Sequence, residues 1–516
     1  MKSIIFLLLV ILVFSHPTVL TAQQVLYSST ISNASNTRFE VIGKAGNYYW
    51  IQKSRKYSST KKWATPWLND KDLNFEIYDA RMNRVRIIPS PISDTVQKEY
   101  LVAGEHYFDQ LTFTNPANKT SIFLTRYTPE GTIVHYKDTL ISFPGTMLGN
   151  DFLLLRSQDR NKILLLGFES VKESSPRIHA ILYNSNWKVI YQRVYKDPNL
   201  TQPYIQYDFI NYPLEHFDSS PVKLGDNGDW FMLAPSQRNN NYLLFHFQSF
   251  DSNFIQTEIK LPQKPRVQNL SLWLDNERDE VLAGVLLNTN IPTVKKSRIA
   301  HYIISQCRVD FDTTYRFNTL AANKTKDENL FEQYFIPVPG KGFMFLKEYG
   351  RPNSSAFLND EVEKADEEDT DMPVQKIPVS FNKNDYTRYD NLYGPRSNYD
   401  RGDLSLYYFP ATHMDSCWSG IINKEQTGDL NSPYLSYAVI PIESKLIFLY
   451  NSLFRNDNKY SSTTVLDIKG NPLNEGVVFW KSNNVLDFQK ARQITEKELA
   501  VPYEKNNGLG FAIIRL

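Results

Sequence analysis

The chain contains few of the residues on which several common classes of site depend. Its 516 residues include only two cysteines, Cys307 and Cys417, and 21 glycines. Two cysteines do not make a disulfide framework, so two separate thiols are the favoured interpretation and a bridge between them is the alternative. Lysine and arginine (57) balance aspartate and glutamate (56). The net charge of +1 therefore gives no reason to expect a nucleic acid or an anionic membrane as partner.

The sequence also lacks the short signatures of many enzymes. It has no Gly-x-Ser-x-Gly elbow, no His-Glu-x-x-His motif, no phosphate-binding loop and no dinucleotide fingerprint. Four histidines fall in strand-like runs, namely His135, His179, His246 and His301. They could converge on a metal at a ring axis, but strand residues with hydrogen-bonded rings are the favoured interpretation. The sequence therefore gives no residues to which we assign a catalytic role, a metal site or a bound cofactor.

Long apolar runs are absent beyond the first residues. Lys2 is followed by the apolar run Ile4–Phe14 and by a polar stretch that ends at Ala22, which is the anatomy of a secretory signal peptide. The run is shorter than the roughly 20 residues that cross a bilayer, and an anchor helix or core strand is the alternative. We predict that residues 1–22 are cleaved. The mature protein is then exported to the periplasm, the cell surface or the medium, without a membrane span.

What the sequence has in abundance is aromatic residues in a repeated pattern. Tyrosine and phenylalanine number 31 each, and aromatic side chains favour strands. A strand–turn–strand unit is clear at Phe75–Ile88, Ile122–Leu140, Ile178–Tyr195, Tyr242–Leu261 and Thr463–Trp480. Weaker copies are centred near Asp310–Asp312 and His413–Asp415. A unit repeated at this spacing predicts one small structure stacked many times.

In its repeats the chain resembles β-propellers, without the Trp-Asp dipeptide of WD40 repeats or the Gly-Gly doublet of kelch repeats. We predict that residues 23–516 form a single all-β propeller of seven blades, each with four antiparallel strands. Pairing of the N-terminal run Val25–Ile31 with the C-terminal run Gly510–Arg515 would close the ring and leave no exposed edge. A pair of β-sandwiches and a smaller propeller with an added domain are the alternatives. Because glycine is scarce, asparagine and aspartate are expected to form many of the turns.

One segment breaks the repeat inside the sixth unit, from about residue 351 to 401. Its first part, Asp360–Asp371, has eight acidic residues among twelve. Such a block is typical of a solvated loop, and weak Ca²⁺ binding is the alternative. Its second part is rich in tyrosine and arginine, the residue types that dominate binding hot spots. The candidate ligand-binding residues are Tyr386, Arg388, Tyr389, Tyr393, Arg396 and Tyr399, unless these rings pack back onto their own blade.

Two functions fit these observations. The favoured one is an exported, non-catalytic recognition or scaffold protein, expected to be a monomer, which binds a protein or carbohydrate ligand on the face that carries the insertion. The alternative is an enzyme that acts on a polysaccharide or peptide at the mouth of the central channel. That alternative needs two carboxylates, or a histidine and a carboxylate, to meet at the mouth.

Overall fold

The computed structural model describes most of the repeated units and few of the long connections between them. The described residues are 25–32, 37–55, 74–89, 96–114, 119–144, 152–169, 177–200, 221–236, 241–260, 266–288, 294–318, 333–338, 341–352, 398–410, 417–422, 426–429, 437–442, 445–453, 459–473, 480–481, 484–488, 491–495, 497–506 and 508–515.

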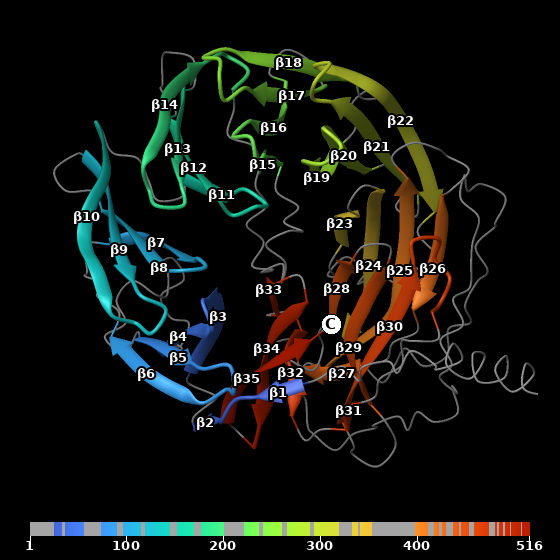
Figure 1. The fold of residues 1–516 in the computed structure, drawn as a ribbon. Coiled ribbons are helices and arrows are strands. Elements are labelled where there is room, and N and C mark those ends of the chain that lie inside the picture. Colours follow the sequence, from blue (N-terminus) through green and yellow to red (C-terminus); the bar gives the residue numbers. More distant parts are fainter. Residues whose placement is uncertain are drawn as a thin grey trace, which may run out of the picture.

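The strands form eight antiparallel sheets arranged as the blades of a ring (Figure 1). The prediction of a single all-β propeller is confirmed, and the predicted number of seven blades is wrong. Blades are numbered here from 1 to 8 in chain order, with the sheet that holds both chain ends as blade 8. None of the described segments forms a helix of the length and apolarity needed to cross a membrane.

Blades 1 to 4 are regular four-stranded sheets. Blade 1 contains β3 (Thr37–Ala45), β4 (Tyr48–Arg55), β5 (Asn74–Tyr78) and β6 (Arg84–Pro89). Blade 2 contains β7 (Val96–Ala103), β8 (Phe108–Thr114), β9 (Lys119–Tyr127) and β10 (Ile133–Pro144). Blade 3 contains β11 (Phe152–Arg156), β12 (Lys162–Glu169), β13 (Arg177–Asn184) and β14 (Val189–Lys196). Blade 4 contains β15 (Val222–Leu224), β16 (Trp230–Pro235), β17 (Tyr242–Phe247) and β18 (Phe254–Ile259).

Blades 5 and 7 follow the same four-stranded plan, and blades 6 and 8 have additional strands. Blade 5 contains β19 (Arg266–Asp275), β20 (Glu280–Asn288), β21 (Val294–Ile303) and β22 (Arg308–Asn318). Blade 6 contains β23 (Gln333–Val338), β24 (Gly342–Pro352), β25 (Asn398–Pro410), β26 (Trp418–Ile422) and β27 (Gln426–Asp429). Blade 7 contains β28 (Tyr437–Ile442), β29 (Lys445–Leu453), β30 (Lys459–Asp467) and β31 (Trp480–Lys481). Blade 8 contains β32 (Val485–Leu486), β33 (Arg492–Thr495), β34 (Glu498–Lys505), β35 (Gly508–Arg515), β1 (Val25–Tyr27) and β2 (Ile31–Ser32).

The two ends of the chain meet in blade 8, as predicted from the terminal apolar runs. β1 lies antiparallel to β35, with Val25 opposite Ile514, and Ser28 Oγ accepts a hydrogen bond from the Phe511 N–H at 3.0 Å. This closure explains why the sequence predicted seven blades and not eight. Each of blades 1 to 7 contributes a hairpin between its third and fourth strands, but in blade 8 these strands are β35 and β1. No turn joins them, so counting hairpins gives one blade too few.

Side chains rather than glycines close many of the hairpin turns. In blade 1 the Asp79 carboxylate accepts hydrogen bonds from the N–H groups of Arg81 and Asn83, both at 2.9 Å, and Asp467 does the same in blade 7. The fourth residue of such hairpin turns has a positive φ even where it is not glycine, as at Met82 in blade 1 (65°) and Trp187 in blade 3 (60°). The expected use of aspartate and asparagine in turns is confirmed. The turn predicted at Asp310–Asp312 lies earlier, at residues 304–307, and Asp310 belongs to β22.

Two outer strands also donate hydrogen bonds to the turns of the next blade. Arg86 of β6 donates to the Glu130 carbonyl and the Thr132 hydroxyl in the turn of blade 2, at 3.4 and 3.3 Å. Arg193 of β14 binds three carbonyls in the turn of blade 4, those of Gln248, Ser249 and Asp251. Large apolar side chains fill the space between the blades, and the Trp50 ring stacks on Phe108 at 3.9 Å.

The insertion joins the second strand of blade 6 to its third strand. β24 and β25 stay paired up to Pro352 and Tyr399, and β27 pairs with the same part of β25. The predicted limits at 351 and 401 therefore fall inside strands. Residues 353–397, with the acidic block and its possible Ca²⁺ site, lie outside the described residues, as does the predicted signal peptide.

Candidate functional site

One five-residue turn, Gly225–Asp229, carries the polar groups that the structure gathers most closely. It joins β15 to β16 in blade 4, and the Gly225 N–H donates to the Asp229 carbonyl at 2.7 Å. Gly228 has φ +97°, and a Cβ there would lie 3.0 Å from Leu182 of blade 3, so the position favours glycine. Asp229 and Asp226 of this turn belong to two separate polar groups, one inside the sheet and one at the surface.

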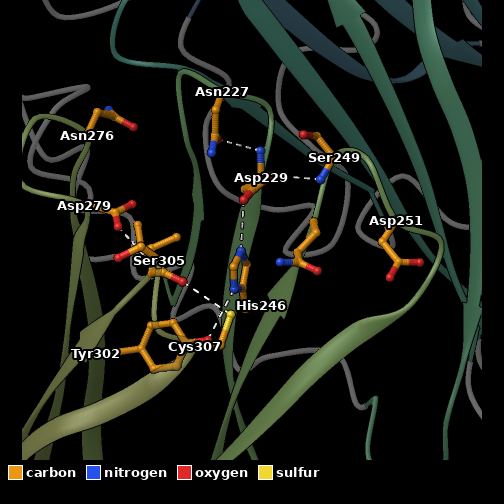
Figure 2. Close-up of polar contacts among 12 residues, drawn as sticks. Asn227, Asp229, His246, Ser249, Asp251, Asn276, Asp279, Tyr302, Ser305 and Cys307 are labelled. Atoms are coloured by element: carbon orange, nitrogen blue, oxygen red, sulfur yellow. Dashed lines mark hydrogen bonds and ion pairs between the residues drawn. The ribbon is translucent and has the colours of Figure 1, made fainter.

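Asp229 begins a buried chain of hydrogen bonds that runs from blade 4 to blade 5 (Figure 2). Its Oδ2 lies 3.0 Å from His246 Nε2, and His246 Nδ1 lies 3.3 Å from the Tyr302 hydroxyl. Its Oδ1 accepts the Ser249 N–H at 2.7 Å. Because an ionised carboxylate only accepts hydrogen bonds, His246 Nε2 carries a proton. The Tyr302 hydroxyl can then donate to Nδ1.

The surroundings fix the ionisation of both ends of this chain. Burial by itself would raise the pKa of Asp229, but the hydrogen bonds from His246 and Ser249 outweigh it and lower the pKa below its ordinary value. Burial, with Cys307 nearby, raises the pKa of Tyr302 well above its ordinary value. Asp229 is therefore charged and Tyr302 neutral at physiological pH.

An aspartate that holds a histidine is also the arrangement of a general base. Here, however, the His246 ring is 1% exposed and stacks on Phe231 with the ring centroids 4.6 Å apart. Tyr302 is equally buried. A substrate cannot reach such a histidine, so the chain from Asp229 to Tyr302 is a polar junction between blades 4 and 5. The interpretation of His246 as a strand residue with a hydrogen-bonded ring is confirmed.

The second group lies at the surface, where the turns between first and second strands meet. The Asp226 carboxylate accepts the N–H of Asp159, from the equivalent turn of blade 3, at 3.0 Å. The Asp226 N–H donates to Asn276 of blade 5 at 3.0 Å, and Asn276 donates to Gln158 of blade 3 at 3.2 Å. We call the residues Gln158, Asp159, Asp226 and Asn276 the axial cluster. It ties three consecutive blades together beside the centre of the ring.

A further contact shows that this end of the axis is bridged. Arg160 of blade 3 donates to the Ile494 carbonyl of blade 8 at 3.2 Å. Blades 3 and 8 are not neighbours in the ring, so this hydrogen bond crosses the axial opening. Figure 1 places β33, which contains Ile494, toward the centre of the ring.

The two aspartates of the axial cluster differ in their acidity. Burial and the nearby negative charge of Asp159 raise the pKa of Asp226, although backbone N–H groups oppose the shift. For Asp159, burial opposes ionisation, but hydrogen bonds from Ser157 and Asn161 outweigh it and lower the pKa. Opposite shifts in adjacent carboxyl groups are typical of acid–base pairs. Short-range sequence patterns gave no sign of this pair, because its members are 67 residues apart.

The residues predicted to bind a ligand are only partly placed. Tyr399 belongs to β25, opposite Pro352. The other five, Tyr386, Arg388, Tyr389, Tyr393 and Arg396, lie outside the described residues.

The histidines and cysteines proposed for other roles do not converge. His179, His246 and His301 lie on third strands and His135 on an outermost strand, so none lies on an axial first strand. Within the described ranges no three histidine, cysteine or acidic side chains are grouped to hold a metal. Cys307 and Cys417 are separate thiols, as favoured from the sequence.

Comparison with known proteins shows no family for this chain, and its likenesses to solved structures are distant. No model of a protein family matches the chain, and no curated protein matches it. Among solved structures, the Dos1 propeller is 10% identical over 95% of this chain and 94% of that chain, with a TM-score of 0.40. The propeller domain of the Trilobed protease from Pyrococcus furiosus is 10% identical over 81% of this chain and 94% of that one, with a TM-score of 0.33. An acylaminoacyl peptidase of Pyrococcus horikoshii is 7% identical over 92% of this chain and 59% of that chain, with a TM-score of 0.35.

Proposed function

We propose that the protein is an exported recognition or scaffold protein that binds a protein or glycan through the insertion of blade 6. The observation that carries the proposal is the base of the insertion. Residues 353–397 depart from and return to neighbouring backbone positions, because Pro352 lies opposite Tyr399. Binding residues are often found on loops that a rigid scaffold positions.

The local structure of blade 6 supports this role. β24 and β25 have 11 and 13 residues, whereas the second and third strands of blade 1 have 8 and 5. The added strand β27 pairs with Asn398–Arg401, the part of β25 next to the insertion. The blade is thus lengthened next to the first and last residues of the insertion. A plain connection would not need this reinforcement, since β8 and β9 are joined by residues 115–118 alone.

Removal of the insertion tests this function. A variant in which four residues replace 353–397 matches the length of the β8–β9 connection and should fold, with its melting temperature within a few degrees of the parent. It should lose the partners that the full chain captures by crosslinking in its native envelope fraction. A variant with the acidic residues of 360–371 changed to their amides separates general charge from the tyrosine- and arginine-rich part. Recovery of the same partners by the deletion variant would refute the proposal.

The axial cluster favours a second candidate, hydrolysis of a polysaccharide or peptide at the ring axis. The Asp226 carboxylate accepts the Asp159 N–H there, and the two carboxyl groups have opposite pKa shifts, which supports this alternative. If the pair is catalytic, changing both to asparagine should abolish release of sugars or peptides from cell-wall substrates, by about 100-fold or more for a lost acid–base pair. The insertion deletion should leave that activity unchanged. No difference between the parent and the double variant would exclude catalysis by this pair.

A further inference from the structure

The outer rim of blades 1 to 3 exposes large apolar side chains on strands that end their sheets. They are Val85 and Ile87 of β6, Ile133, Val134 and Tyr136 of β10, and Val189, Ile190 and Val194 of β14. These three strands lie at the periphery of the ring (Figure 1). Each is the last strand of its sheet, so within the described part of the chain its outer edge pairs with no other strand. Free edges with apolar side chains are templates for another strand.

β14 is the most regular of the three edges. Its register with β13 has a single shift, next to Ile190, and is unbroken from Tyr191 to Lys196. β10, by contrast, has three register shifts and a positive φ at Lys137, and such bulges hinder the addition of a strand. β6 has only six residues. A partner strand of six or more residues therefore fits β14 best.

The inner contacts of β14 hold this edge in place. Arg193 binds the turn of blade 4, and Tyr195 packs edge-on against Phe247 with centroids 4.7 Å apart. Because side chains alternate along a strand, Gln192, Val194 and Lys196 share the opposite face, and all three are exposed. The strand is thus fixed from one side and open on the other, which spares a partner the cost of ordering it.

The charge of the rim indicates what kind of partner fits. β6, β10 and β14 together contain five lysine or arginine residues and one acidic residue, while the whole chain has a net charge of only +1. On β14 the exposed cations are Lys188, just before the strand, and Lys196 at its end, with Ile190 and Val194 between them. A segment that carries apolar side chains flanked by carboxylates on one face complements this pattern.

We infer that β14 is a docking edge for an extended, acidic polypeptide segment of a partner protein, which pairs with it as an additional strand. Backbone hydrogen bonds to the free edge supply affinity in this mode of binding, and the alternate side chains supply selectivity. Apolar side chains of the segment cover Ile190 and Val194, and its carboxylates reach Lys188 and Lys196. This surface is independent of the insertion proposed to carry the main function.

A fluorescent peptide with the sequence Glu-Thr-Val-Thr-Val-Thr-Glu, added to the full chain, is the direct probe, because its valines and glutamates lie on one face of an extended strand. Fluorescence anisotropy should show saturable binding that weakens as salt is added. Two double variants, I190T with V194T and K188E with K196E, should each weaken it about tenfold, through loss of cross-strand and charge pairs. Lys137→Glu on β10 is the matched control and should leave the affinity within about twofold.

Three further measurements decide the inference. A peptide with N-methyl groups on alternate amides should not bind, because it keeps the side chains but cannot form the ladder. The same peptide with lysine in place of both glutamates should also fail. Equal binding by either peptide, or an equal loss in the Lys137→Glu variant, would overturn the inference, as would sedimentation showing that β14 only joins two copies of this chain. The insertion deletion should bind the peptide normally, so failure here is separable from failure of the proposed function.

Discussion

Replacement of Asp109 by alanine is expected to lower the free energy of unfolding by about 3–5 kcal/mol, the usual cost of leaving one member of a buried ion pair alone. Asp109 lies on β8 and accepts two hydrogen bonds from Arg126 of β9, from Nε at 2.7 Å and Nη2 at 2.8 Å. It also accepts Trp187 Nε1 of blade 3 at 2.8 Å. Asp109 and Arg126 are buried, so the variant leaves a desolvated guanidinium without its anion and frees the indole that joins blades 2 and 3.

Urea unfolding followed by tryptophan fluorescence measures this loss. Asp138→Ala is the matched control, because Asp138 pairs with His135 at 3.0 Å on the exposed strand β10, and exposed pairs contribute only about 0–1 kcal/mol. A double variant, Asp109→Leu with Arg126→Met, removes both charges and should be more stable than Asp109→Ala. Equal midpoints for Asp109→Ala and Asp138→Ala would show that the pair between β8 and β9 does not stabilise the ring.

The second large effect concerns acid stability and the junction at Asp229. Because the pKa of Asp229 is lowered in the folded protein, the unfolded chain binds a proton more readily than the native state does. The contribution of this carboxylate is therefore complete above its unfolded pKa, about 3.9, and is lost as the pH falls through the lower folded pKa. Loss of hydrogen bonds between a charged group and its partners costs about 1.5–3 kcal/mol each.

The Asp229→Asn variant isolates this titration. At neutral pH it should unfold at a lower urea concentration than the parent, since His246 then faces a neutral acceptor. Below about pH 4 the two proteins should approach one another, because the parent carboxylate becomes protonated. Asp138→Asn controls for general charge effects. A difference between parent and Asp229→Asn that stays constant from pH 7 to pH 3 would contradict the role given to Asp229.

Local patterns predicted those parts of the fold that form locally. Hairpins such as Asp79–Asn83 are encoded by turn residues between two strands, and the sequence places them within a few residues. The eighth blade has no such turn between β35 and β1, so the same reasoning missed it. The polar contacts of the candidate site were also missed, because they join residues that are distant in sequence. Asp229, just before β16, and His246 of β17 are 17 residues apart, and only the register of β16 with β17 brings them into contact.

Sequence patterns could not predict the axial cluster either. Asp159 and Asp226 come from equivalent turns of two blades, and their approach depends on how the blades pack around the axis. In the sequence both look like ordinary turn aspartates, and both do lie in turns. The tyrosine- and arginine-rich insertion was recognised from composition alone, and of its named residues the structure places Tyr399, at the start of β25.

The junction of the two chain ends has a consequence for biosynthesis. Ser28 and Phe511 are 483 residues apart in sequence and hydrogen-bond to each other in blade 8. During translation the first strand must wait for the last one before the ring can close. Contacts between such distant residues form slowly, and until then β1 and the growing stack of blades both have open edges.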